Sequence, residues 1–293
     1  MPILVTGATG NVGRLVVDEL LARGAAVRAL TKDPALADLP SGVEVVVGSL
    51  ARPSTLPAAL AGVEDVYLAP MARTVTRFCE LAAEAGVRRV VALSGSSVGD
   101  ETDGSSGPEF AAVEAAVTAA GFTRTFLRPG VFMANSLGWA EPLRTHGEIR
   151  TAYPEATQTP IDLSDIAAVA AHVLTTEGHD GRTYVLSGPE ALSLREMAAK
   201  VAVALGRAVP FVELTREQQH AEWVELGIPG EIADWLLDGF AAVVARPQVP
   251  TGVVEQLLGH RGVTYSEWAA RVWPAAVGPS VIRPSGVSPS RID

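Results

Sequence analysis

The sequence predicts an α/β protein with a doubly wound parallel sheet and a small, mostly helical second lobe. The chain opens on an apolar run at 3–5 that breaks into Gly7, Gly10 and Gly13 ahead of an amphipathic helix. Short Val/Leu-rich segments then alternate with helical patterns up to about residue 130. Most of these segments lack polar alternation, as strands covered on both faces do. Beyond Pro129 the alternation stops, and all five tryptophans follow.

The elements of the first part can be placed in order. Strands are expected at 3–6, 27–30, 43–47, 65–68, 89–93 and 123–127. Helices are expected between them at 11–23, 34–39, 53–61, 74–85 and 108–120. Glycine follows four of these helices, as it does at helix ends: Gly24, Gly62, Gly86 and Gly121. Short connections between alternating elements indicate parallel strands joined by right-handed crossovers.

The three glycines predict a phosphate-binding turn. Gly7 allows the tight turn, Gly10 lets the backbone approach a pyrophosphate, and Gly13 lets helix and strand pack closely. The helix N-terminus adds free N–H groups and a partial positive charge. An ordinary turn is the alternative, but the flanking strand and helix favour a dinucleotide and a Rossmann domain over 1–130. The contacts expected from this loop are Thr6, Gly7, Thr9, Gly10, Asn11, Val12 and Gly13.

The end of the second strand predicts which dinucleotide binds. An acidic residue there suits the ribose of NAD, and a basic residue suits the 2′-phosphate of NADP. Thr31 and Lys32 stand at this place, and Asp33 comes one position late, before a proline, where it would cap a short helix. We therefore predict NADP (NADPH) rather than NAD. The alternative for Lys32 is a solvated loop charge.

The second part, 131–276, is predicted to be a substrate-binding lobe from which the chain returns to the sheet. Residues 131–160 indicate loop with at most a short helix, followed by a helix at 162–175 and a strand at 184–187. Three capping-box signatures mark further helix starts: Ser193 with Glu196, Thr215 with Gln218, and Thr264 with Glu267. Residues 277–293, rich in Pro, Ser and Gly, are predicted to be a disordered tail.

The composition of the chain argues against several classes of binding partner. The net charge is −10 with no Lys/Arg cluster, which argues against nucleic acid and anionic membranes. No apolar run approaches the roughly 20 residues of a membrane span, and no signal peptide is evident. The single cysteine, Cys79, excludes an intrachain disulfide and fits a packed thiol in a cytoplasmic protein. The five histidines show no metal-ligand spacing, so no metal is expected.

Several motifs together resemble a known family. They are T-G-A-T-G-N-V-G (6–13), L-T-K-D-P (30–34), L-S-G-S-S (93–97), L-R-P-G-V-F-M-A-N (127–135), I-D-L-S-D-I-A (161–167) and L-L-G-H-R-G-V-T-Y-S-E-W-A (257–269). Residues 1 to about 272 resemble the NmrA-like atypical short-chain dehydrogenase/reductase family, which includes NAD(P)H-dependent quinone reductases. The resemblance implies strand order 3-2-1-4-5-6-7, a cofactor across the strand ends and a substrate between the lobes.

The resemblance also exposes a missing pair of residues. Standard short-chain dehydrogenases use Ser, Tyr and Lys, with the Tyr donating a proton to the substrate oxygen and the Lys lowering its pKa. Ser94 stands at the place of the serine, but Phe110 and Glu114 occupy the Tyr and Lys positions. The candidate catalytic residues are therefore Ser94, Ser96 and Glu114. For the serines the alternative is loop hydrogen bonding, and for Glu114 an exposed helix face.

The resemblance places the remaining cofactor contacts, and the aromatic residues of the second part indicate where a substrate would lie. Further cofactor contacts are expected at Ser49, Leu50, Ala69, Pro70, Met71, Ser94, Pro129, Gly130, Val131 and Phe132. A flat, apolar or aromatic small-molecule substrate is expected against Phe132, Asn135, Trp139, Trp223 and Trp235, whereas Trp268 is expected in the core. Core packing is the alternative for Phe132 and for the tryptophans, and a loop hydrogen bond is the alternative for Asn135.

These expectations predict a function with two alternatives. The preferred hypothesis is a bacterial NADP(H)-dependent oxidoreductase, a monomer or homodimer, that reduces a quinone or similarly activated molecule without the Tyr-Lys dyad. The first alternative is a non-catalytic NADP-sensing regulator. The second is a non-redox epimerase or cyclase on the same fold.

Overall fold

The computed structural model describes residues 1–278. Apart from Val277 and Gly278, at the end of the last helix, the predicted disordered tail lies outside the described residues.

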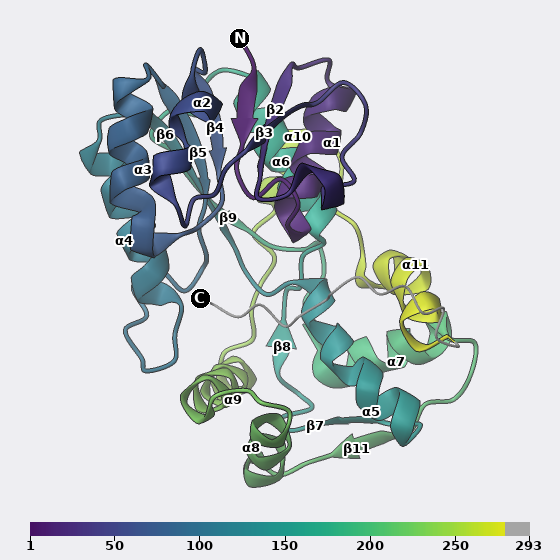
Figure 1. Ribbon diagram of the computed structural model, residues 1–293. Coiled ribbons are helices and arrows are strands. Elements are labelled where there is room, and N and C mark those ends of the chain that lie inside the picture. The colour runs from purple at the N-terminus through teal and green to yellow at the C-terminus, as the bar shows by residue number, and fades with distance from the viewer. Residues whose placement is uncertain (279–293) are drawn as a thin grey trace.

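A seven-stranded sheet forms the larger part of the molecule (Figure 1). Its order is β3-β2-β1-β4-β5-β6-β9 and all six pairings are parallel, which confirms the predicted doubly wound topology. The strands are β1 (Ile3–Val5), β2 (Val27–Thr31), β3 (Glu44–Val47), β4 (Asp65–Leu68), β5 (Arg89–Leu93), β6 (Thr123–Pro129) and β9 (Thr183–Leu186). The order reverses between β1 and β4, where an open α/β sheet binds ligands.

Helices cover both faces of this sheet (Figure 1). One core joins the sheet to α1 (Asn11–Ala22), α6 (Leu163–Thr175) and α10 (Val253–Leu258), and the other joins it to α2 (Pro57–Leu60), α3 (Ala72–Glu84) and α4 (Gly107–Ala119). Cys79 lies in the second core, where burial raises the pKa of its thiol to about 11. Residues 253–258 lie in the predicted lobe at 131–276, and as α10 they pack against α6 in the first of these cores.

The predicted helix at 53–61 is interrupted. The structure has a 3₁₀ turn, η2 (Pro53–Thr55), and then α2, which begins at Pro57. A proline inside a helix has no N–H to donate, and its ring collides with the preceding turn, so Pro57 begins a new helix instead of continuing one. A second 3₁₀ turn, η1 (Pro34–Leu36), stands at the predicted short helix.

The lobe below the sheet in Figure 1 holds the remaining elements. They are η3 (Met133–Trp139), α5 (Ala140–Thr145), β7 (Ile149–Thr151), β8 (Thr157–Gln158), β10 (Leu192–Ser193), α7 (Leu194–Ala204), β11 (Phe211–Glu213), α8 (Arg216–Glu225), α9 (Gly230–Ala245) and α11 (Tyr265–Val277). The prediction that 131–160 is loop with at most a short helix was wrong. β7 pairs with β11 and β8 with β10, so their partners lie far along the chain and leave no local signal.

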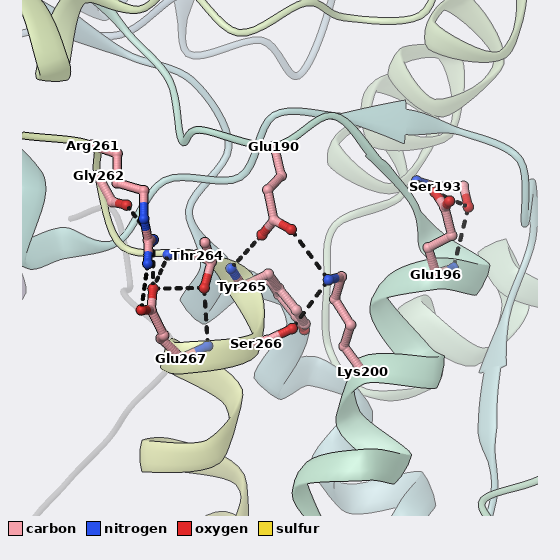
Figure 2. A network of polar contacts seen from close by, with 10 residues as sticks. All are labelled: Glu190, Ser193, Glu196, Lys200, Arg261, Gly262, Thr264, Tyr265, Ser266 and Glu267. Atoms are coloured by element: carbon pink, nitrogen blue, oxygen red, sulfur yellow. Dashed lines mark hydrogen bonds and ion pairs between the residues drawn. The ribbon is translucent and has the colours of Figure 1, made fainter.

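The capping boxes predicted from sequence are all present. Ser193, Thr215 and Thr264 each accept a hydrogen bond from the backbone N–H three residues on, and the side chains at those positions accept in return. Figure 2 shows two of them at the starts of α7 and α11. These caps satisfy N–H groups that a helix start leaves unpaired.

A second set of contacts joins the same two helices (Figure 2). Lys200 of α7 donates to Glu190 at 3.2 Å and to the Ser266 hydroxyl at 3.1 Å. The other carboxylate oxygen of Glu190 accepts the Tyr265 N–H at 2.8 Å. Beside this network Trp268, 4% exposed, packs in the lobe core, which confirms its predicted place.

Asp165 is a buried acid that joins α6 to the segment before α11. Its side chain, 4% exposed, accepts the Val263 N–H at 2.9 Å, and Asp162, His260 and Arg271 supply the nearby charges. Burial raises the pKa of Asp165 to about 6, against the opposing hydrogen bond. The folded state therefore binds the carboxyl proton of Asp165 more tightly than the unfolded chain does, since the pKa of an unperturbed Asp is about 3.9.

Asp165 should give a measurable pH dependence of stability. Because its folded-state pKa is raised, its contribution is most favourable below pH ~4 and is lost as the pH rises through 6. Asp165→Asn keeps an acceptor for Val263 and removes the buried charge. We expect the free energy of unfolding of the variant at pH 7 to exceed that of the native chain by up to about 3 kcal/mol. This difference should disappear as the pH falls towards 4. Urea unfolding across this range checks it, with the exposed Asp103→Asn as control; a constant gap contradicts it.

Candidate cofactor and active site

The glycine turn has the geometry that its sequence predicts. Gly7 has a positive φ of 61°, and its carbonyl oxygen accepts the Gly10 N–H at 2.9 Å. A Cβ on Gly13 would lie 2.1 Å from the Gly7 oxygen, so helix α1 passes directly over the turn. Gly10, the N-cap, gives no side-chain bond to the first turn of α1. The helix N–H groups there are left for an anion.

Thr6 fixes the strand that carries this turn. Its hydroxyl donates to the Tyr67 carbonyl at 3.0 Å and accepts the Ala69 N–H at 2.8 Å. Both bonds reach the end of β4, the strand beside β1 at the reversal of the sheet. The side chain is fully buried, so Thr6 joins the ends of β1 and β4 and exposes no surface to a ligand.

A cavity of about 340 Å³ opens at the carboxyl ends of β1 to β4. Nine predicted cofactor residues line it: Gly7, Thr9, Thr31, Lys32, Ser49, Leu50, Ala69, Pro70 and Met71. Sequence reasoning missed four others, Leu30, Asp33, Leu36 and Gly48. The remaining predicted contacts lie outside this lining: Thr6, Gly10, Asn11, Val12, Gly13, Ser94, Pro129, Gly130, Val131 and Phe132.

The rim of the cavity offers a cation and an apolar edge. Lys32 is exposed and forms no ion pair with any residue in 1–278. Asp33 accepts the Ala35 N–H at 3.0 Å and caps η1, as predicted. Leu36, 82% exposed, adds an apolar surface. Asp33 is thus occupied by the turn, and Lys32 is available for a phosphate.

Glu114 lies in a buried polar cluster at the end of β5. Its carboxylate accepts the Ser94 hydroxyl at 2.6 Å and two bonds from the Arg128 guanidinium, at 2.8 and 2.6 Å. Burial opposes its charge, but the bonds from Arg128 and Ser94 prevail and lower the pKa of Glu114. At 8% exposure, the alternative of an exposed helix face is wrong.

Arg128 is the member of this cluster that sequence reasoning missed. It belongs to β6, next to β5, and its side chain is half-buried. The sequence could have indicated this residue, because Arg128 is a charged residue within the apolar strand T-F-L-R-P. A guanidinium that is taken out of water needs an acidic partner. That partner, Glu114, comes from the helix between the two strands.

Phe110 takes the place of the missing tyrosine and packs on the backbone. A Cβ on Gly95 would lie 2.3 Å from the Phe110 ring, so the ring rests on the residue that follows Ser94. Ser96, the residue after Gly95, is exposed, and the Ser96 N–H donates to the Pro129 carbonyl at 3.0 Å. Among the hydrogen bonds within residues 1–278, none involves the Ser96 hydroxyl.

The segment after β6 is held by the sheet. The Gly130 N–H donates to the Leu186 carbonyl of β9 at 2.9 Å, and Phe132 forms a bridge with Ile161. Phe132 also packs against the core of the α1 face. Asn135 is exposed, and its N–H donates to the Phe132 carbonyl at 3.1 Å.

The three tryptophans expected at the substrate have different packing and hydrogen-bond partners. Trp139 packs against the lobe core, and Trp223 stands edge-on to Phe240 with ring centroids 6.1 Å apart. Trp235 of α9 instead reaches the loop after β5, where its indole N–H donates to Asp100 at 2.8 Å. That bond joins the helical lobe to the segment that follows Ser94.

No group of three or more His, Cys, Asp or Glu side chains in residues 1–278 is placed to hold a metal ion. Across the same residues, no helix combines the length and the apolar character that crossing a bilayer requires.

Comparisons with known proteins place this geometry among reductases. A family model described as NAD(P)H-binding matches residues 7–177. The chain is 35% identical over 277 residues to an NAD(P)H azoreductase of Xenophilus azovorans, covering 91% of this chain and 96% of that protein. It is 38% identical over 284 residues to a (4-alkanoyl-5-oxo-2,5-dihydrofuran-3-yl)methyl phosphate reductase of Streptomyces griseus, covering 92% and 96%. The solved NADPH complex of an Escherichia coli quinone oxidoreductase matches with a TM-score of 0.80 at 26% identity, covering 92% of this chain and 99% of that one.

Proposed function

The chain belongs to the NAD(P)H-binding family, and on that premise we propose that it is an NADPH-dependent reductase of quinones or similarly activated small molecules. The observation that carries the proposal is the cavity at the reversal of the sheet, with the glycine turn on one side and Lys32 at the rim. The relatives named above, an azoreductase and a quinone oxidoreductase among them, support the same reaction class.

The residues fit the cofactor part by part. The turn and the first N–H groups of α1 would receive the pyrophosphate, and Lys32 the 2′-phosphate. Leu36 and Leu50 supply apolar surface for the adenine. The nicotinamide would then lie towards Met71 and the segment 129–132, next to Ser94. The substrate residues Phe132, Asn135, Trp139, Trp223 and Trp235 remain part of this proposal.

The missing Tyr-Lys dyad favours an activated acceptor. The cofactor, when bound, supplies a hydride, that is, two electrons and a proton. A quinone that receives it becomes a phenolate-type anion, which is stable until water protonates it. An ordinary ketone would become an alkoxide, which needs a proton donor at once. Since Phe110 replaces the tyrosine that donates this proton, and Glu114 replaces the lysine that assists it, the site suits the quinone, with Ser94, Ser96 and Glu114 as the polar groups beside it.

The remaining predictions complete the proposal. We place the cofactor domain at 1–130 and the substrate lobe at 131–276, in a cytoplasmic monomer or homodimer. An NADP-sensing regulator is the second candidate, because the same missing dyad would suit a protein that binds the cofactor without turnover.

Turnover measurements decide between reductase and regulator. We expect purified protein to oxidise NADPH in the presence of 1,4-naphthoquinone, with one hydroquinone formed per NADPH consumed. NADPH binding is measured on the same sample by fluorescence. Tight binding with no oxidation by a panel of quinones and azo dyes would support the regulator instead.

A further inference from the structure

A second cavity, of about 360 Å³, lies on the face of the sheet that α1, α6 and α10 cover (Figure 1). Its lining comes from these three helices and from the segment 260–263 that follows α10. No residue of this lining also lines the cofactor cavity. The volume lies at the lower end of the range of small-molecule pockets, ~300–1,000 Å³. The second cavity is therefore large enough for a small organic molecule and separate from the cofactor cavity.

Asp165 of α6 is the most deeply buried polar side chain of this lining, at 4% exposure. One of its carboxylate oxygens, Oδ2, accepts the Val263 N–H at 2.9 Å, and no donor within residues 1–278 reaches the other, Oδ1. Oδ1 is not among the side-chain atoms of that range that are enclosed without a partner. It therefore keeps accessible surface, and because Asp165 lines the cavity, that surface opens on the cavity.

The charge of Asp165 is not neutralised by a bonded cation. Within residues 1–278 Asp165 takes part in no ion pair, and the nearby Arg271 guanidinium is bonded to Asp162 instead. Burial raises the pKa of Asp165 to about 6, although His260 and Arg271 act to lower it. At pH 7 the carboxylate is thus mostly ionised, and a buried charge of this kind is costly until a cation pairs with it.

The other charges of the lining do not offset Asp165. The Arg23 guanidinium donates to the Ala168 carbonyl at 3.5 Å, and its Nε lies 4.0 Å from the Glu19 carboxylate. Neither Arg23 nor Glu19 is among the charges that act on Asp165. Burial and neighbouring positive charges lower the pKa of His172, so that ring is neutral at pH 7. The uncompensated charge of the cavity is therefore the negative charge of Asp165.

We propose that the second cavity binds a small primary amine as its ammonium ion, with the ammonium group on Asp165 and an apolar tail against Leu257 and Leu258. An ammonium needs only one carboxylate and donates through its own N–H groups. A metal ion needs several ligands, and no group of three or more His, Cys, Asp or Glu in residues 1–278 is placed to supply them. The two leucines, both partly buried against the core, suit an alkyl chain. The inference goes beyond the proposed reductase function and does not depend on it.

Three six-carbon probes with different head groups test the charge of the ligand on the native protein. They are hexylammonium, 1-hexanol and hexanoate, and their dissociation constants are measured by NMR titration at pH 7. We expect hexylammonium to bind roughly ten- to hundredfold more tightly than 1-hexanol, which is the range for a hydrogen bond to a charged group. Hexanoate should bind more weakly than 1-hexanol, because Asp165 repels it. Equal affinity for the three probes, or no binding of hexylammonium, overturns the inference.

Two variants assign the binding to this cavity. Asp165→Asn should lose the preference for hexylammonium over 1-hexanol, because the amide carries no charge, whereas the exposed control Asp103→Asn should keep it. Ala168→Leu leaves Asp165 in place but fills part of the cavity, and should weaken hexylammonium at least about tenfold. Hexylammonium should also raise the melting temperature of the native chain and not that of Asp165→Asn.

A preference for hexylammonium that persists in Asp165→Asn overturns the inference, and so does native affinity in Ala168→Leu. The comparison of probes on native protein needs no variant, so it decides the matter even where a substitution prevents folding. No measurement here uses NADPH or a quinone, so failure of this inference and failure of the proposed reductase function are distinguishable.

Discussion

Gly13→Ala should abolish useful NADPH binding and destabilise the chain. The added Cβ would lie 2.1 Å from the Gly7 oxygen and 2.7 Å from the Gly7 carbonyl carbon. Both are backbone atoms of the turn, so the turn and α1 must separate. We expect the affinity for NADPH to fall at least about a hundredfold, because the N–H groups that receive the pyrophosphate move out of place. Unfolding free energy should fall by about 3 kcal/mol.

The control for this substitution is Gly239→Ala. Gly239 lies inside α9, has no positive φ, and a Cβ there meets nothing within 4 Å. Alanine is favoured over glycine within a helix by about 1 kcal/mol, so this variant should be as stable as the native chain or more so. Titration of NADPH fluorescence and thermal unfolding measure both variants. Native-like NADPH affinity in Gly13→Ala would show that the turn does not bind the cofactor.

Lys32→Ala should weaken NADPH far more than NADH. Lys32 is exposed at the rim of the cavity, where Asp33 is occupied by its bond to Ala35. A hydrogen bond to a charged phosphate contributes about 1.5–3 kcal/mol, so NADPH affinity should fall roughly ten- to hundredfold. NADH lacks the 2′-phosphate, and its affinity should change less than about twofold.

The chain provides its own control for lost positive charge. It contains two lysines, and the second, Lys200, lies in the helical lobe on Glu190 and Ser266. Lys200→Ala changes the net charge equally and should leave the NADPH-to-NADH preference unchanged. Equal weakening of both cofactors by Lys32→Ala would reject Lys32 as the phosphate contact.

Interactions within one stretch of chain were readable from the sequence. The turn at Gly7 to Gly13, the cap at Asp33 and the three capping boxes each bring together residues at most six positions apart. Their geometry follows from φ preference and hydrogen bonding between near neighbours. Val/Leu-rich runs without alternation gave the strands and hence the side of the sheet on which a ligand binds.

The contacts around Glu114 could not be predicted from the sequence in the same way, because they join residues of different elements. Glu114 was identified by its spacing from Phe110, but its burial depends on Arg128, which reaches it from the next strand. The bond from Trp235 to Asp100 crosses 135 positions, so no local pattern in the sequence indicates it. β7 and β8 exist only because β11 and β10 pair with them.

The sequence by itself determined that this chain holds a dinucleotide, because phosphate binding needs only a strand, a glycine turn and a helix start, all within thirteen residues. Only the tertiary structure decided which way the Ser94 hydrogen points. That direction depends on the charge of Glu114, and the charge depends on a guanidinium from another strand.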